Sequence, residues 1–70
     1  MIDVSLKGVR CRAASEIFDI DGTIGAATEG TIIYELEGEG GQLVNVRWDN
    51  GTRSLVSSEE IVITDVVTWN

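Results

Sequence analysis

The 70-residue sequence contains no histidine, no proline and one cysteine, Cys11. A single cysteine excludes an intramolecular disulfide, and it excludes a zinc site built from cysteines of one chain. We therefore expect a reducing, cytoplasmic setting with Cys11 buried in a strand. The alternative is a reactive thiol, because Arg10 and Arg12 flank Cys11 and would lower the pKa of an exposed thiol.

Long apolar runs are also lacking, since no uninterrupted run exceeds three residues. A membrane-spanning helix needs about 20 apolar residues, so we expect no membrane partner. The length predicts one domain over residues 1–70, and folding of so short a chain buries only about 60% of the surface that the unfolded chain exposes. The core must be thin, so a binding site is expected on a surface groove or loop.

Basic residues are scarce. Five lysines and arginines stand against twelve acids, which gives a formal net charge of −7. This field repels a phosphate backbone, so direct nucleic-acid binding is disfavoured. Only Lys7, Arg10 and Arg12 form a local basic edge, near the start of the chain.

The first half of the chain has one clear strand pattern and one region without a period. Met1 to Leu6 alternates apolar and polar residues and predicts a half-buried strand. Val9 to Ala13 predicts a second strand, or a continuation of the first beyond a bulge, with Val9, Cys11 and Ala13 on one face. Ala14 to Glu29 predicts a long acidic loop, in which residues 13–18 could form a short helical turn.

Two later strands are clearer. The segment Thr31 to Glu37 predicts a strand with Ile32, Tyr34 and Leu36 on the core face. A glycine-rich turn over residues 38–41 leads to Leu43 to Asp49, where Val44, Val46 and Trp48 share a face. The pattern therefore places Trp48 and Tyr34 in the core or at its rim.

Asn50-Gly51 is a strong signal for a two-residue hairpin turn of type I′. That turn would place Asp49 opposite Thr52, Trp48 opposite Arg53, Arg47 opposite Ser54 and Val46 opposite Leu55. Arg53 could then lie on the Trp48 ring as a cation–π pair. The segment 57–60, Ser-Ser-Glu-Glu, predicts an N-capped single helical turn before the strand Ile61-Val62-Ile63.

The order of these elements matches the second half of an SH3-like β-barrel. The segments 29–32 (Glu-Gly-Thr-Ile), 44–52 (Val-Asn-Val-Arg-Trp-Asp-Asn-Gly-Thr) and 60–61 (Glu-Ile) resemble small bacterial and phage proteins of unassigned role. Those proteins carry a Gly-Thr-Val strand and a Val-x-Trp-Asp-Asn-Gly hairpin. The chain is more distantly similar to the SH3-like domain of mind-bomb-type ubiquitin ligases. The resemblance covers about half the chain and implies an SH3-like fold with ligand contact through loops and exposed aromatics.

We accordingly predict an all-β fold, a small SH3-like β-barrel of five to six short strands with one short helical turn. A β-sandwich or an OB-like barrel is the alternative fold.

The segment 18–24, Phe-Asp-Ile-Asp-Gly-Thr-Ile, resembles the first motif of haloacid-dehalogenase-type phosphatases. The resemblance implies Asp19 as nucleophile, Asp21 as acid/base and Thr23 as a phosphate or metal neighbour. That chemistry also needs a buried parallel strand before the motif and a downstream lysine, whereas the only lysine is Lys7. We therefore interpret Asp21-Gly22 as a turn and predict no catalytic residues, metal site or cofactor.

An EF-hand interpretation would place residues without suitable oxygen ligands at obligatory positions. A weak cation-binding loop of Asp19, Asp21 and Glu29 stays an alternative.

The predicted function is a non-enzymatic protein-interaction module, a monomer or weak homodimer that recognises a basic or aromatic protein surface. An acidic inhibitor that mimics nucleic acid is the second hypothesis, and a hydrolase built on Asp19 and Asp21 is the third. For Trp69 the sequence leaves open whether it packs on the barrel or on a partner. The candidate binding residues are Phe18, Asp19, Asp21, Trp48, Asp49, Arg53 and Trp69.

Overall fold

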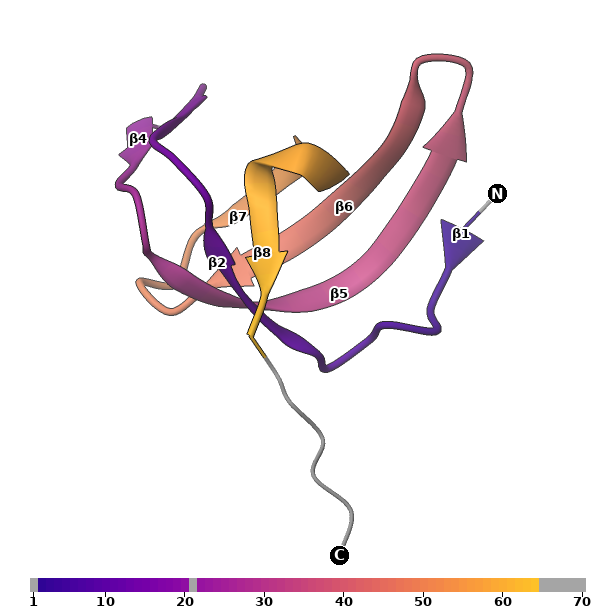
Figure 1. Ribbon diagram of the computed structural model, residues 1–70, viewed down its shortest axis with the longest axis horizontal. Helices are drawn as coiled ribbons and strands as arrows, with labels where there is room; N and C mark the ends of the chain where they lie inside the picture. The colour runs from indigo at the N-terminus through magenta and orange to yellow at the C-terminus, as the bar shows by residue number, and fades with distance from the viewer. Residues whose placement is uncertain (1, 21, 65–70) are drawn as a thin grey trace, which may run out of the picture.

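The computed structural model describes residues 2–20 and 22–64, and it is an all-β structure (Figure 1). Its main sheet has the strand order β7-β6-β5-β2-β8, with β1 paired to β5, and β3 and β4 form a separate two-stranded sheet. All the strand pairs are antiparallel. The strands are β1 (Ile2–Asp3), β2 (Arg10–Ala13), β3 (Ile17–Asp19), β4 (Gly22–Ile24), β5 (Glu29–Gly38), β6 (Gly41–Trp48), β7 (Arg53–Ser57) and β8 (Ile61–Ile63).

The predicted all-β class is confirmed, but a closed barrel is not. Among the described strands, no pairing joins the two ends of the main sheet, β7 and β8. In the same part of the chain, no helix is long and apolar enough to cross a membrane.

The core lies on one face of the main sheet. Trp48, Val46 and Cys11 are almost completely buried, and the β3–β4 hairpin adds Ile17 and Ile24. The prediction of a buried Cys11 is confirmed, and burial raises the pKa of its thiol. The buried apolar cluster consists of Cys11, Ala13, Ile17, Ile24, Ile32, Val44, Val46, Trp48 and Val56.

A bulge in β5 overturns the predicted face of this strand. Ile32 lies opposite Val46, but Tyr34 lies opposite Asn45, so Ile33 is an extra residue on β5. Because alternation has a period of two, one extra residue exchanges the faces beyond it. Tyr34 therefore lies on the outer face, and Glu35 turns inward and is buried, where Gln42 donates a hydrogen bond to its carboxylate.

The turn at Asn50 is also different from the predicted one. The loop has three residues, Asp49 to Gly51, and it is closed by hydrogen bonds from the Trp48 N–H to the Thr52 carbonyl and from the Gly51 N–H to the Trp48 carbonyl. Gly51 has a φ of +93°, whereas Asn50 does not have a positive φ, so the turn is not of type I′. The Asn50 side chain instead accepts hydrogen bonds from the backbone N–H and the hydroxyl of Thr52.

The register of β6 and β7 consequently shifts by one residue. Arg53 lies opposite Arg47, and Ser54 lies opposite Val46. Arg53 and Trp48 then point to opposite faces of the sheet, and the predicted cation–π pair is wrong.

Ser57 caps a short 3-10 helix, η1 (Ser58–Glu60), as the sequence predicts. Its hydroxyl accepts a hydrogen bond from the Glu59 N–H at 3.4 Å, and the Glu60 carboxylate accepts one from the Ser57 N–H at 3.1 Å. This reciprocal capping box fixes the direction of the chain as it enters β8.

Two predictions for the first third of the chain are wrong in detail. Within the segment predicted as a strand from Met1 to Leu6, only Ile2–Asp3 is a strand, and Met1 lies outside the described residues. The expected helical turn at residues 13–18 is absent, and the supposed loop contains β3 and β4. The predicted common face of Val9, Cys11 and Ala13 is confirmed.

Candidate functional site

The β3–β4 hairpin presents two apolar side chains to solvent. At its base, Ile17 lies opposite Ile24, and both are buried. Further along the hairpin, Phe18 is 79% exposed and Ile20 is 95% exposed. Large apolar side chains with this exposure are available for contact with another molecule. We call Phe18 and Ile20, with Asp19 between them, the hairpin tip.

A chain of hydrogen bonds joins the hairpin tip to the main sheet. The Trp48 indole Nε1–H donates to the Ser54 hydroxyl at 3.0 Å, and that hydroxyl donates to Asp19 Oδ2 at 2.7 Å. The other carboxylate oxygen of Asp19 accepts from the Ile20 N–H at 2.7 Å. The buried indole N–H thus has a hydrogen-bond acceptor, and the Asp19 carboxylate links the hairpin to β7 through the Ser54 hydroxyl.

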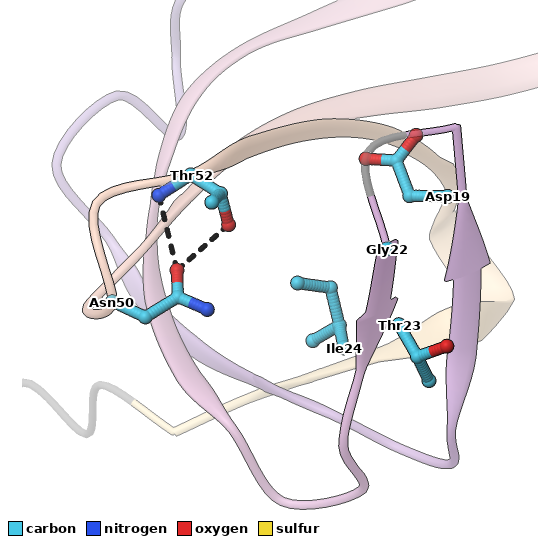
Figure 2. Close-up of a pocket in the computed structure, with 6 residues that line it drawn as sticks. All are labelled: Asp19, Gly22, Thr23, Ile24, Asn50 and Thr52. Carbon is cyan, nitrogen blue, oxygen red and sulfur yellow. Dashed lines mark hydrogen bonds between the residues drawn. The ribbon is translucent and has the colours of Figure 1, made fainter.

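A small cavity of about 110 Å³ lies between the hairpin and the β6–β7 turn (Figure 2). Ile24 points from β4 toward the turn that carries Asn50, and Asp19 lies at the far end of the hairpin (Figure 2). This volume is smaller than the roughly 300 to 1,000 Å³ of typical small-molecule sites. The lining residues are Asp19, Gly22, Thr23, Ile24, Asn50 and Thr52.

The structure brings some of the predicted binding residues together and separates others. Asp19 and Trp48 both hydrogen-bond to Ser54, so the β3–β4 hairpin lies beside the β6–β7 hairpin. Trp48 is only 1% exposed, however, which confirms its predicted core position and leaves its ring no free surface for a partner. Arg53 is exposed on the opposite face of the sheet. Asp21 and Trp69 lie outside the described residues.

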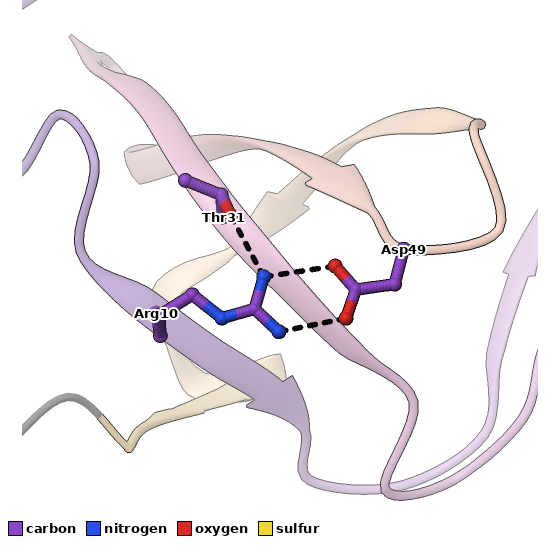
Figure 3. Close-up of polar contacts among 3 residues, drawn as sticks. All are labelled: Arg10, Thr31 and Asp49. Carbon is purple, nitrogen blue, oxygen red and sulfur yellow. Dashed lines mark hydrogen bonds and ion pairs between the residues drawn. The ribbon is translucent and has the colours of Figure 1, made fainter.

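Asp49 forms an ion pair with Arg10 (Figure 3). The guanidinium donates from Nη1 to Asp49 Oδ1 at 2.8 Å and from Nη2 to Oδ2 at 2.7 Å, and Nη1 also donates to the Thr31 hydroxyl at 2.9 Å. The hydrogen bonds from Arg10 hold the pKa of Asp49 below its ordinary value, and those to Asp49 raise the pKa of Arg10. Both carboxylate oxygens of Asp49 are thus occupied within the protein.

This ion pair predicts a loss of stability in acid. Because the pKa of Asp49 is lower in the folded than in the unfolded chain, its contribution is complete above the ordinary value of 3.8. The contribution is lost as the pH falls through the lower, folded value. We expect Asp49→Asn to flatten the decline in melting temperature below pH 3.8, measured by circular dichroism.

Glu39→Gln is the matched control, because Glu39 is an exposed acid in the β5–β6 turn. A decline that is equally steep in the wild type and in Asp49→Asn would contradict the assignment to Asp49.

The surroundings of Asp19 differ from those that the phosphatase-like motif requires. Strand β3 pairs antiparallel with β4 in a two-stranded sheet, whereas the motif needs a buried parallel strand. Lys7 lines a different groove from the cavity at Asp19. Within residues 2–20 and 22–64, no group of three or more His, Cys, Asp or Glu side chains could hold a metal ion.

Comparisons of the chain with protein-family models, with curated proteins and with solved structures gave no match.

Sequence reasoning missed Ile20, which belongs to the hairpin tip, and Ser54, which anchors the hairpin tip to the main sheet. Ile20 was passed over because it lies inside the Asp-Ile-Asp-Gly motif, although an apolar residue between two acids in a turn is itself a signal of exposure. Ser54 was missed because its role depends on Asp19, which lies 35 positions away in the chain.

Proposed function

We propose that this protein is a non-enzymatic protein-interaction module that contacts its partner through the hairpin tip. The observation that carries the proposal is the 95% exposure of Ile20 on a hairpin that is anchored to the core. An anchored apolar group loses little conformational entropy on binding, so burying it contributes directly to affinity.

An SH3-like architecture is part of this proposal. It is supported by the order of β5, turn, β6, tight turn, β7, η1 and β8, and by the long connection between β2 and β5 that carries the hairpin. This connection holds the hairpin tip at the surface.

The partner surface should combine an apolar pocket with a basic rim. The apolar part follows from Phe18 and Ile20, and the basic rim follows from the net charge of −7 and the exposed acid Glu16 beside β3. Complementary charge speeds association and determines orientation, while the apolar contact supplies most of the affinity.

Selection from a random peptide library on the immobilised protein tests this function. We expect enrichment of peptides that join Lys or Arg to large apolar residues. Ile20→Ser should weaken their binding by about 2 kcal/mol, or about thirtyfold. Because Ile20 is almost fully exposed, its replacement should change the stability by less than about 0.5 kcal/mol. Titration calorimetry of the selected peptides measures the loss in affinity.

The matched control is Ile2→Ser, which removes another exposed isoleucine, on β1. Equal binding of the selected peptides to wild type and Ile20→Ser would contradict the proposal. Enrichment of arginine-rich peptides without apolar residues would favour the nucleic-acid mimic.

A further inference from the structure

Three of the five basic residues of this acidic chain line one groove of about 320 Å³. They are Lys7, Arg47 and Arg53, and no acid is among the described residues that line the groove. In a chain with twelve acids, this local reversal of charge sets the groove apart from the rest of the surface. Gly8, Thr31, Ile32 and Ile33 complete its lining.

The sheet register places two cations directly opposite each other. Thr31 of β5 lies opposite Arg47 of β6, which lies opposite Arg53 of β7. Like charges directly opposite each other destabilise a sheet. Within the described part of the chain, neither guanidinium has an ion-pair or hydrogen-bond partner.

Asp49 does not neutralise the positive charges of Arg47 and Arg53. Arg47 helps to lower the pKa of Asp49, but Asp49 gives both carboxylate oxygens to Arg10. Arg10 also donates to the Thr31 hydroxyl, which leaves the hydroxyl hydrogen available for an acceptor in the groove (Figure 3).

Backbone irregularities form the side of the groove. Ile33 is the extra residue of the β5 bulge, and bulges are common next to binding sites because they redirect side chains. The segment that contains Gly8 lies beside β5, because the Gly8 N–H donates a hydrogen bond to the Ile32 carbonyl at 2.8 Å. Gly8 has a φ of +89° and no Cβ, so its backbone is open to close approach by a ligand.

We propose that this groove binds a small phosphate monoester, with the phosphate between Lys7, Arg47 and Arg53 and the organic group on Ile33. A guanidinium presents two parallel N–H donors that match the oxygens of a phosphate. A monoester carries about two negative charges at pH 7, enough to relieve the repulsion between the two arginines.

A small anion fits the charge distribution better than a polyanion does. The Debye length is about 8 Å at physiological ionic strength, so a small ligand experiences chiefly the local cations. A nucleic acid would extend beyond the groove onto a protein whose net charge is −7 and would be repelled there.

The test is a titration of nitrogen-15-labelled protein with phenyl phosphate, followed by NMR at constant ionic strength with sodium chloride as the reference salt. We expect saturable shifts of the amide signals of Gly8, Thr31, Arg47 and Arg53. Inorganic phosphate should shift the same signals with lower affinity, because it lacks the apolar group. Arg47→Gln should weaken the binding of phenyl phosphate at least about tenfold, the usual effect of losing charge-assisted hydrogen bonds.

Arg12→Gln is the matched control, because it removes the same charge at an exposed position of β2 that does not line the groove. The affinity of the Arg12→Gln variant for phenyl phosphate should change by less than a factor of about two, since screened surface charges contribute little to binding. Equal losses in the two variants, or shifts that do not saturate, would overturn the proposal.

Two further measurements separate ligand binding from other roles of these arginines. Arg53→Gln should leave the melting temperature of the ligand-free protein unchanged or higher, because it removes like-charge repulsion, and a marked decrease would indicate a purely structural role. A single-stranded oligonucleotide that saturates the same signals at lower concentration than phenyl phosphate would show a polyanion surface and would also overturn the proposal.

The groove is independent of the hairpin tip. Ile20→Ser should therefore bind phenyl phosphate as the wild type does, so failure of the groove and failure of the proposed peptide site give different results. The absence of phenol release in the same samples would separate binding from the hydrolysis that a phosphatase interpretation of Asp19 predicts.

Discussion

Replacing Trp48 with alanine is expected to lower the free energy of unfolding by about 3 to 5 kcal/mol. The side chain is 1% exposed, and it is among the largest fully buried side chains of the protein. Its loss leaves a cavity under β5 and β7, and it removes the donor that holds Ser54. For a chain of 70 residues, whose stability should lie near about 5 kcal/mol, this is most of the total. Urea unfolding followed by circular dichroism measures the change.

Phe18→Ala is the matched control, because it truncates an aromatic side chain that is 79% exposed. We expect it to change stability by less than about 1 kcal/mol, since it creates no cavity. A similar loss in the two variants would show that Phe18 is buried in solution and would contradict the exposed hairpin tip.

Ser54→Ala separates the hydrogen bond of the indole from its packing. It leaves the Trp48 N–H without its acceptor and removes the donor to Asp19 Oδ2. The free energy of unfolding should fall by about 1 to 3 kcal/mol, which is the usual effect of leaving a buried donor unpaired. Hydrogen exchange in β3 and β4 should increase more than exchange in β5 and β6, because Ser54 anchors the hairpin.

Gly30→Ala is expected to lower the free energy of unfolding by about 1 to 3 kcal/mol. Gly30 is buried opposite Trp48. A Cβ at this position would lie 2.7 Å from Val46 Cγ1, 2.9 Å from the Arg47 carbonyl oxygen and 2.9 Å from Trp48 Cε3. The carbonyl belongs to the backbone of β6 and cannot move independently of its strand. This overpacking outweighs the gain of about 0.5 to 1 kcal/mol that alanine usually brings in a strand.

Gly38→Ala is the control on the same strand, because a Cβ there meets no atom within 4 Å and Gly38 does not have a positive φ. We expect it to be neutral or slightly stabilising. Thermal unfolding of the two variants tests the difference, and an equal effect would contradict the close packing of Trp48 on Gly30.

Several features could be predicted from the sequence because they depend on a few consecutive residues. Ser57 and Glu60 stand at the spacing of a capping box, and the helical turn follows. The burial of Cys11, Val46 and Trp48 follows from apolar alternation within their own strands. The position of the turn near Asn50 was also correct, but its length was not, because Asn-Gly fits both a two-residue and a three-residue loop.

The candidate site was predictable only in part. The sequence placed Phe18 and Asp19 in a long loop and among the candidate binding residues, and the structure brings Asp19 to Ser54 of β7. The hairpin itself was not predicted, because β3 and β4 have three residues each and no alternation long enough to detect.

By itself, the sequence determined the all-β class, the places of the turns and the helical cap, and most of the core, because these follow from local patterns and local hydrogen bonds. The tertiary structure alone decided which residues lie opposite one another. The bulge at Ile33 turned Glu35 inward, and the three-residue turn placed Arg53 against Arg47. A strand pattern with a period of two does not specify the partner strand or the register, and one extra residue exchanges the two faces. The exposure of Ile20 and the gathering of Lys7 with Arg47 and Arg53 depend on contacts between distant segments, which no local pattern contains.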